Sequence, residues 1–310
     1  MYSTLTLIVF RQVLVISSSS FLQTWLGLEF ALVRFIFLLK FRNSPSFRII
    51  LYFIVQSVGS LAILVRFFRD EPYDLFFIDS ALLLKIGLGP FYIWVPALVS
   101  YLNWWRTFLL LTFIKIGPLV LLSLSRTPSY AFLAIGTLRA GLGAILGYTE
   151  IEVKKLVAFS SLSHMGWLLC AIGVFFQLWR LYILIYTLNL FVFTFTVRIK
   201  KIKNFNFTVN RLKTHLRLAL IIASIGGAPP TTGFIMKWLV LDSLCSTSRV
   251  FWSLPLIIRG TLSIAFYLKL GVRALLKNAT SLIKISKTLI LKEFFLIYFL
   301  CPMFFVWISI

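Results

Sequence analysis

Four ionisable side chains lie inside otherwise apolar runs of the sequence. Glu29 lies in LGLEFAL, Lys85 in LLLKIGLGPFYIW, Lys115 in LTFIKIGPL and Lys237 in GFIMKWLVL. A charge at the centre of a membrane span costs at least ~2.5 kcal/mol on insertion scales, so such groups usually face a protein interior or a water path. Burial favours the neutral amine of a lysine, and a nearby carboxylate favours the ammonium. Three lysines and one carboxylate therefore form a candidate proton relay, in which neighbouring groups switch one another.

Snorkelling is the alternative explanation for such charges, because a long side chain near a helix end can reach the headgroups. The three lysines lie roughly half a membrane from the nearest loop, and Glu29 has no long stem, so snorkelling is disfavoured for all four. Lys269 is followed by further basic residues toward the same surface, which favours snorkelling there. For Arg139, two interpretations stay open: a buried structural ion pair and a functional role.

The sequence does not favour a metal, nucleophilic or nucleotide site. Lysines dominate the buried charges without a cluster of oxygen ligands, and no arrangement resembles a Ser/His/Asp constellation. Cys170, Cys245 and Cys301 are scattered without metal or disulfide spacing. The glycines of GLGAILG follow no strand, so they are a very weak nucleotide fingerprint. We expect no cofactor in this chain.

Prolines interrupt two of the lysine runs. Pro90 follows Lys85 by five residues, and Pro229 and Pro230 precede Lys237 in GGAPPTTG. Proline removes a backbone donor, and in lipid the freed carbonyl must find another partner. Broken helices at corresponding places in two halves of a chain are typical of the midplane site of a transporter. A plain kink with a packing role is the alternative for either one alone.

His164 lies among hydroxyl side chains in SSLSHMGW, near the start of an apolar run. A lone histidine in such a setting is often a hydrogen-bonded structural residue. The alternative is a proton shuttle, because imidazole changes its charge near neutral pH. Both interpretations stay open at this point.

Composition places these residues in a membrane. The chain has 310 residues, of which 60% are hydrophobic and 13% charged, with 31 Lys+Arg against 9 Asp+Glu and a net charge of +22. Its mean hydropathy is +0.97, which excludes an ordinary soluble globule. A soluble chain with this charge would suggest a nucleic-acid partner. Here the basic residues separate long apolar runs, which predicts a membrane protein and no nucleic acid.

We therefore predict an all-α, polytopic membrane protein that forms one membrane domain over residues 1–310. A span needs about 20 apolar residues, and the chain contains about eleven such runs, two of them broken. The first run has no basic n-region and no cleavage site, so we interpret it as a mature helix. The predicted spans are roughly 2–20, 22–39, 49–68, 75–100, 103–124, 129–148, 154–176, 178–198, 216–246, 250–276 and 289–310.

Basic residues gather in alternate loops. One set of loops holds the groups around Arg42, Lys154, Lys203 and Lys277, and the polar stretch from about Arg198 to Arg217 is the longest. The other set holds fewer basic residues, offset by Asp70, Glu71, Asp74 and Asp79. The positive-inside rule places the first set on the matrix or cytoplasmic side, together with the N-terminus, and the C-terminus on the opposite side.

A series of motifs resembles a known family. In order, they are FLQTWLGLEFALV, RIILYFIVQSVGS, LLLKIGLGPFYIWVPALVSYL, LLLTFIKIGPL, EVKKLVAFSSLSHMGW and SIGGAPPTTGFIMKWLVL, which cover most of residues 20–242. The series is similar to the antiporter-like subunits of mitochondrial NADH:ubiquinone oxidoreductase (respiratory complex I), and among them to the subunit 2 family.

The resemblance implies a fold and roles for single residues. It implies two inverted five-helix repeats, N-terminally truncated relative to bacterial members. Glu29 would partner Lys85 on the first broken helix, Lys115 would be the central link, and Lys237 would lie on the second broken helix. Tyr92 and Ala97 depart from the histidine and glutamate that the family often has there, so a relay through these two positions is not expected.

The resemblance also implies a setting. A subunit of this kind lies in the mitochondrial inner membrane beside other antiporter-like and small membrane-arm subunits, with lipids such as cardiolipin. FMN, iron–sulfur clusters and ubiquinone are expected in partner subunits, which would carry the redox chemistry. The sequence-level hypothesis is a proton-translocating membrane-arm subunit. A free-standing cation/proton antiporter and a purely structural spacer are the alternatives.

Overall fold

The computed structural model of the chain describes nine stretches, and every regular element in them is helical. The chain divides into two compact units, Met1–Phe132 and Leu133–Ile310. The prediction of a single membrane domain stays a prediction. The described stretches are residues 21–40, 46–67, 75–88, 92–125, 129–150, 152–175, 177–199, 212–229 and 231–276.

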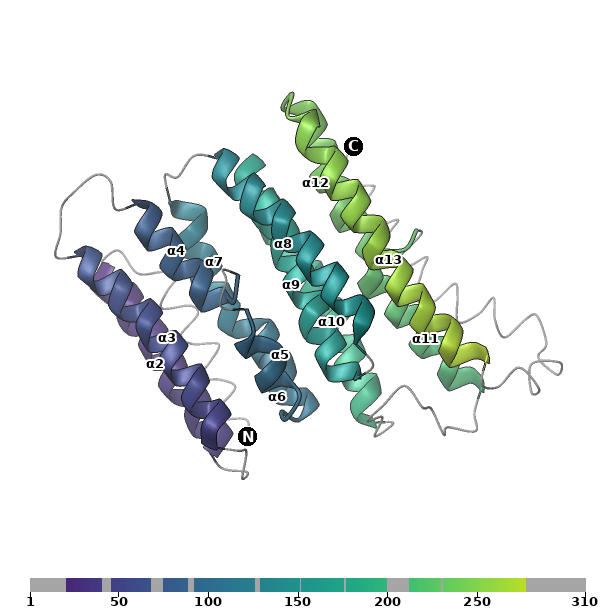
Figure 1. Cartoon of the computed structure of the whole chain (residues 1–310), viewed down its shortest axis with the longest axis horizontal. Coiled ribbons are helices and arrows are strands. Elements are labelled where there is room, and N and C mark those ends of the chain that lie inside the picture. Colours follow the sequence, from purple (N-terminus) through teal and green to yellow (C-terminus); the bar gives the residue numbers. More distant parts are fainter. Residues whose placement is uncertain are drawn as a thin grey trace. The chain divides into compact units, whose positions relative to one another are not determined.

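The helices of the first unit are built from near-continuous apolar sequence. Helix α3 packs against α2, α4 and α5, and α7 packs against α4 and α6 (Figure 1). The bounds are α2 Phe21–Lys40, α3 Ser46–Phe67, α4 Leu75–Ile86, α5 Trp94–Val99, α6 Trp104–Leu111 and α7 Phe113–Leu124. Helix α8 (Ser129–Thr149) crosses the boundary between the two units.

In the second unit, α10 packs against α9, α11 and α12, and α11 lies along α13. Helices α11 and α12 follow one another in nearly the same direction, as expected of one span interrupted in the middle (Figure 1). The bounds are α9 Val153–Val174, α10 Leu178–Ile199, α11 Leu212–Gly226, α12 Thr232–Ser246, the 3₁₀ turn η2 Val250–Trp252 and α13 Ser253–Leu276.

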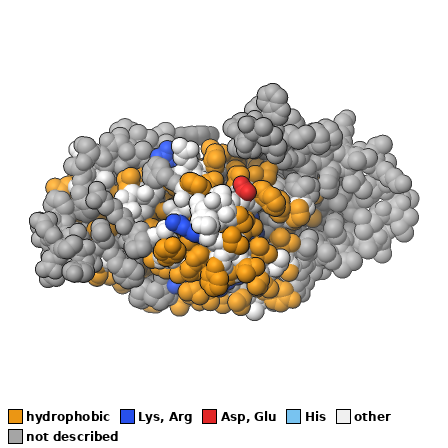
Figure 2. All heavy atoms as spheres, turned by 90° about the horizontal axis from the view of Figure 1, so that it is seen from above, with side chains coloured by type: hydrophobic (Ala, Val, Ile, Leu, Met, Phe, Trp, Pro, Cys, Tyr) orange, Lys and Arg blue, Asp and Glu red, His pale blue; other side chains and the backbone are white. Residues whose placement is uncertain are grey.

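Six stretches in the described part of the chain are long and apolar enough to cross a membrane, namely 22–39, 47–65, 104–124, 129–149, 153–174 and 178–198. Hydrophobic side chains dominate the described part of the face in Figure 2, which suits contact with lipid or with other apolar helices. Two predicted spans, 2–20 and 289–310, lie outside the described residues. The all-helical membrane fold is confirmed, and the count of eleven spans stays a prediction.

Both predicted helix breaks are present. The run 75–100 divides into α4 and α5, and the run 216–246 divides into α11 and α12. Pro229 lies in the turn between α11 and α12, whereas Pro90 and Pro230 lie outside the described residues. The lysine-bearing runs are thus discontinuous where the prolines indicate.

A third interruption was not predicted. The run 103–124 is interrupted at Thr112 (φ −117°, ψ −81°), between α6 and α7. Pro118 lies inside α7, where it has no N–H to offer the preceding turn and its ring crowds the carbonyl four residues earlier. Lys115 therefore also lies next to an irregular turn of backbone, like Lys85 and Lys237.

Three further sequence-level placements were wrong. Asp79 was assigned to a loop, but it lies inside α4 and is 3% exposed. His164 lies in the middle of α9 and not near its start, because this helix begins at Val153 and ends at Val174. The polar stretch is shorter than predicted, since α11 already begins at Leu212. Asp79 stays in its helix because its neighbours in LFFIDSALL are apolar.

Close helix packing in the second unit depends on glycine. A Cβ built on Gly166 of α9 would lie 2.5 Å from the Ala140 backbone nitrogen and 2.6 Å from the Gly136 oxygen, both on α8. A Cβ on Gly143 of α8 would lie 2.6 Å from the Ser163 nitrogen. Small residues let two membrane helices approach until their backbones touch. Gly143 of the GLGAILG motif therefore has a packing role.

Candidate functional site

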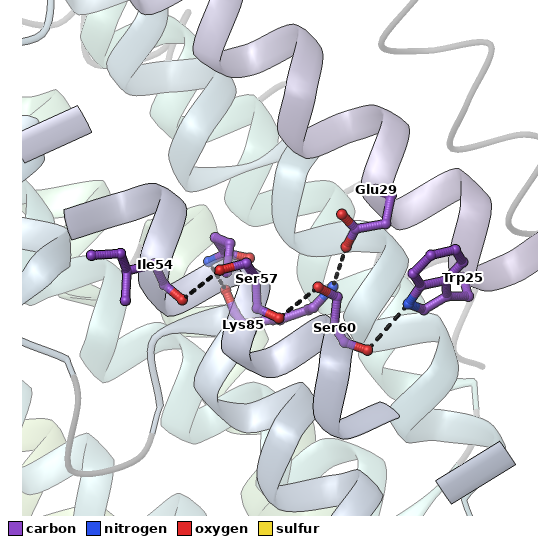
Figure 3. A network of polar contacts seen from close by, with 7 residues as sticks. Trp25, Glu29, Ile54, Ser57, Ser60 and Lys85 are labelled. Atoms are coloured by element: carbon purple, nitrogen blue, oxygen red, sulfur yellow. Dashed lines mark hydrogen bonds and ion pairs between the residues drawn. The ribbon is translucent and has the colours of Figure 1, made fainter. Parts of the chain in front are cut away.

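The charged groups of the first unit include one ion pair, between a buried lysine and a half-buried glutamate. Lys85 Nζ on α4 lies 3.6 Å from Glu29 Oε1 on α2, and the side chains are 3% and 26% exposed (Figure 3). This separation is longer than a charge-assisted hydrogen bond of about 2.7–2.9 Å. The two groups are therefore close enough to influence one another strongly, and loose enough to separate with a small movement.

Helix α3 holds the lysine in place. A Cβ on Gly59 would lie 2.8 Å from Lys85 Cγ and 3.3 Å from Cε, so the lysine stem lies directly over this glycine. Gln56, one turn earlier on α3, donates from Nε2 to the Lys85 carbonyl oxygen at 2.9 Å. The glycine makes room for the side chain, and the glutamine holds its backbone.

Helix α2 is tied to α3 beside the same pair. Trp25, one turn before Glu29, donates from its indole nitrogen to the Ser60 carbonyl oxygen at 3.1 Å. The Ser60 hydroxyl in turn donates to the Ser57 carbonyl oxygen of its own helix at 2.8 Å. Figure 3 shows these contacts around Glu29 and Lys85. They fix the position of Glu29 along the axis of α3, and so its position relative to Lys85.

Lys115 lies near the start of α7 and is 2% exposed, which places it among the most buried large side chains of the described chain. Helix α7 packs against α4, the helix that carries Lys85. At the interruption directly before α7, the Phe108 carbonyl oxygen accepts from both the Thr112 hydroxyl at 2.7 Å and the Thr112 N–H at 3.1 Å. A lysine enclosed in this way must either be neutral or have compensating partners.

In the second unit, Lys237 of α12 reaches back to the end of α11. Its ammonium donates to the Gly226 carbonyl oxygen and to the Ser263 hydroxyl of α13, both at 2.7 Å. It also lies 5.8 Å from the ring centroid of Trp167 on α9, within reach of a cation–π attraction. The residue is 5% exposed. Helices α9, α11 and α13 thus meet at this one side chain.

His164 of α9 contacts the Ile225 carbonyl at the end of α11, next to the Gly226 carbonyl that Lys237 contacts. Its Nε2 lies 3.0 Å from the Ile225 carbonyl oxygen, and its Nδ1 lies 2.9 Å from the Tyr182 hydroxyl. A carbonyl can only accept, so Nε2 carries the hydrogen and the neutral ring accepts at Nδ1. The C-terminal end of a helix carries partial negative charge. The imidazole N–H and the Lys237 ammonium therefore occupy successive carbonyls at a favourable place.

Two charged residues inside helices, the buried Asp79 and the half-buried Arg259, were not among the predicted site residues. Asp79 lies on the same short helix as Lys85, six residues earlier. Arg259 of α13 packs over Gly141, whose added Cβ would lie 2.8 Å from Arg259 Nε, and its Nη1 is buried without a hydrogen-bond partner among the described residues. Both interrupt apolar runs, LFFIDSALL and PLIIRGTL, so the signal used for Glu29 was available for them.

The structure thus places four of the predicted charged and titratable site residues in two groups, one in each unit, and places Lys115 on α7. Glu29 and Lys85 form an ion pair, and His164 and Lys237 share the end of α11. Arg139 is half-buried on α8 and has no role that the structure explains. Within the described residues, no group of three or more His, Cys, Asp or Glu side chains is placed to hold a metal ion.

A family model described as NADH:quinone oxidoreductase/Mrp antiporter, TM, matches residues 73–263, which is more than half of the chain. The chain belongs to this family. NADH-ubiquinone oxidoreductase chain 2 of Anopheles gambiae is 30% identical over 292 residues, covering 88% of this chain and 85% of that relative. The resemblance identified from the motifs is confirmed.

Chains of two solved structures share the fold of this chain. A chain of respiratory complex I from Thermus thermophilus aligns with a TM-score of 0.77 at 19% identity, over 88% of this chain and 70% of that one. A chain of the Mrp complex from Dietzia sp. DQ12-45-1b aligns with a TM-score of 0.77 at 13% identity, over 86% of this chain and 59% of that one.

Proposed function

We propose that the chain is a proton-translocating membrane-arm subunit of an NADH:ubiquinone oxidoreductase in the mitochondrial inner membrane. Family membership and the insect relative support this assignment. The single observation that carries the mechanism is the ion pair between buried Lys85 and half-buried Glu29, whose charged atoms lie 3.6 Å apart. In this proposal the partner subunits hold FMN, iron–sulfur clusters and ubiquinone. Quinone reduction in those subunits shifts the charged groups of this chain and so moves a proton.

The proposed relay runs through Glu29, Lys85, Lys115 and Lys237, with His164 as a shuttle. When Glu29 approaches Lys85 it favours the ammonium, and when it withdraws the buried ammonium releases its proton and becomes the neutral amine. Charges 3.6 Å apart interact by roughly 4–5 kcal/mol at an effective dielectric constant of about 20. Moving one charge against 100 mV costs about 2.3 kcal/mol. The interaction energy gained and lost when this one pair forms and separates is therefore large enough to move a proton across the membrane.

Topology and partners complete the proposal. Basic residues at the helix ends, such as Arg48, Lys154 and Arg198, favour a matrix location for these ends and for the N-terminus, and an intermembrane-space location for the C-terminus. The exposed apolar side chains of α2, α3 and α10 suit contact with lipid, including cardiolipin, and with other membrane-arm subunits. No redox centre is assigned to this chain.

Removing one partner of the Glu29–Lys85 pair tests the relay. In the assembled complex, Glu29→Gln and Lys85→Met are each expected to lower proton-coupled NADH oxidation by at least about ten-fold, because each removes the charge that switches the other. The double variant is expected to be no worse than Lys85→Met alone. Glu152→Gln, in the exposed pair of Glu152 and Lys155 at 3.5 Å, is the control. Full turnover and proton stoichiometry in both single variants would refute the relay.

His164 has a separate test. Glutamine can donate to the Ile225 carbonyl as the imidazole does at 3.0 Å, but it cannot carry a proton. We expect His164→Gln to assemble normally and to lower proton pumping by at least about ten-fold, within the usual range for a lost acid–base group. The measurements are native-gel migration and protons moved per NADH. Wild-type pumping in this variant would leave His164 with a structural role only.

A free-standing cation/proton antiporter remains the second candidate, because the family description includes Mrp antiporters and the Dietzia chain shares the fold. The two candidates differ in size. A membrane-arm subunit migrates on a native gel within a very large assembly that oxidises NADH, whereas a free antiporter does not. Sodium-dependent proton exchange by the isolated chain would favour the second candidate.

A further inference from the structure

The two broken helices end in the same hydrogen-bonded turn. In α4, Gly87 N donates to Leu84 O at 3.0 Å and Leu88 N donates to Leu83 O at 2.7 Å. In α11, the equivalent bonds run from Gly227 N to Ser224 O at 3.2 Å and from Ala228 N to Ala223 O at 3.1 Å. Both glycines have a positive φ, +84° and +73°, which favours glycine at the end of a helix. Lys85 therefore corresponds to Ile225.

At this corresponding position a side chain from another helix completes the backbone hydrogen bonding. Gln56 Nε2 of α3 donates to the Lys85 carbonyl oxygen at 2.9 Å, and His164 Nε2 of α9 lies 3.0 Å from the Ile225 carbonyl oxygen. Gln56 and His164 are 5% and 3% exposed. A helix end leaves carbonyls unsatisfied, and in a water-free interior each needs a partner. The same need is met twice, by an amide and by an imidazole.

In the first unit, the carbonyl oxygen that accepts from Gln56 belongs to Lys85, the residue that also carries the buried ammonium. We propose that Gln56 is a positioning residue for Lys85: it caps the end of α4 as His164 caps the end of α11, and so sets the separation of Lys85 from Glu29. The consequence for proton translocation rests on the proposed function. The hydrogen bond from the Gln56 amide to the Lys85 carbonyl oxygen at 2.9 Å is independent of the proposed function.

The two caps differ in one chemical property: the imidazole of His164 can itself gain a proton, whereas the amide of Gln56 cannot. An imidazole gains a proton at Nδ1 while Nε2–H keeps its hydrogen bond, so the cap on α11 persists in both charge states. An amide does not change its charge at physiological pH, so the cap on α4 is independent of proton occupancy. Lys85 is thereby anchored in one position while its own charge changes. Lys237, by contrast, contacts the helix end through the ammonium itself.

The test replaces the cap and then restores it. Gln56→Leu leaves the Lys85 carbonyl without its donor, whereas Gln56→His offers an equivalent N–H. In the assembled complex we expect Gln56→Leu to lower proton-coupled NADH oxidation about ten-fold, as for the loss of a buried hydrogen bond. We expect Gln56→His to recover at least about half of the activity. Gln177→Leu, at an exposed glutamine, is the matched control and should behave as wild type.

A double-variant experiment separates positioning from general damage. If Gln56 acts through Lys85, Gln56→Leu should cause no further loss of pumping in a Lys85→Met background. An equal further loss in that background, or a Gln56→His variant as impaired as Gln56→Leu, would overturn the proposal. Thermal unfolding of the assembled complex adds a readout that needs no pumping: Gln56→Leu should lower the midpoint and Gln56→His should restore it. If Lys85→Met pumps normally, the proposed function fails, and the thermal result still decides the cap.

Discussion

Replacing Lys237 by methionine is expected to abolish proton-coupled NADH oxidation in the assembled complex. Methionine keeps an unbranched stem of similar length but loses the ammonium, which donates to Gly226 and Ser263 at 2.7 Å and lies 5.8 Å from the Trp167 ring. The substitution removes the only charge of α12 that contacts the end of α11 in the described part of the chain. It also leaves a buried carbonyl without its donor, a loss of about 1–3 kcal/mol in stability.

A second variant at the same position separates charge from proton exchange. Arginine retains a positive charge and hydrogen-bond donors, but it does not give up its proton in proteins. We therefore expect Lys237→Arg to lose pumping by at least about ten-fold while retaining more of the assembly's thermal stability than Lys237→Met. Lys155→Met, at a lysine whose side chain is 36% exposed, is the control. Pumping at the wild-type level in Lys237→Arg would exclude Lys237 as a proton carrier.

The largest structural effect is expected at Gly166. Alanine there would place a Cβ 2.5 Å from the Ala140 nitrogen and 2.6 Å from the Gly136 oxygen. Because these are backbone atoms of α8, they cannot rotate aside as a side chain does, and the two helices must separate. Overpacking of this kind costs about 3 kcal/mol. Helix α9 also carries His164 and Trp167, so separation of α8 and α9 disturbs the Lys237 site.

The measurement is the amount of assembled complex on a native gel and its thermal midpoint. Gly166→Ala should lower both. Gly260→Ala is the matched control, because its Cβ would meet only Trp167, at 3.4 Å, an ordinary van der Waals contact. A Gly166→Ala complex with an unchanged midpoint would show that α8 and α9 are not in backbone contact in the assembly. Equal losses in both glycine variants would point to general intolerance of the helices instead.

Much of the site was predictable because charge is expensive in a membrane. Glu29, Lys85, Lys115 and Lys237 stood out as single charges in apolar runs, and all four lie in helices of the structure. The same rule should have selected Asp79, which is 3% exposed in α4. It was missed because other acidic residues precede it closely, so it was counted among the charges of that loop although it lies inside the predicted span 75–100. The rule identifies buried charges only when each charge is assigned to its span or its loop correctly.

Partner residues are a different matter. The sequence alone did not indicate Gln56, since a glutamine in an apolar helix has no distinctive spacing and its partner is a backbone carbonyl 29 residues away. Nor did it indicate that His164 and Lys237 would share the end of α11. Backbone carbonyls are the same at every position, so only the packing of helices decides which of them a side chain meets.

The lone carboxylate among the lysines suggested that Glu29 can pair with one of them, and the motifs made Lys85 the expected partner. By itself, the sequence determined that this chain is a helical membrane protein with two proline-broken, lysine-bearing helices, because hydrophobic run length, charge and proline act locally along the chain. The tertiary structure decided how close the groups lie: 3.6 Å between Glu29 and Lys85, and 2.7 Å between Lys237 and the Gly226 oxygen. It did so through Gly59 and Gly166, where the lack of a side chain lets helices from distant parts of the sequence meet. Proton exchange depends on differences of about an ångström, and such differences arise from packing rather than from residue type.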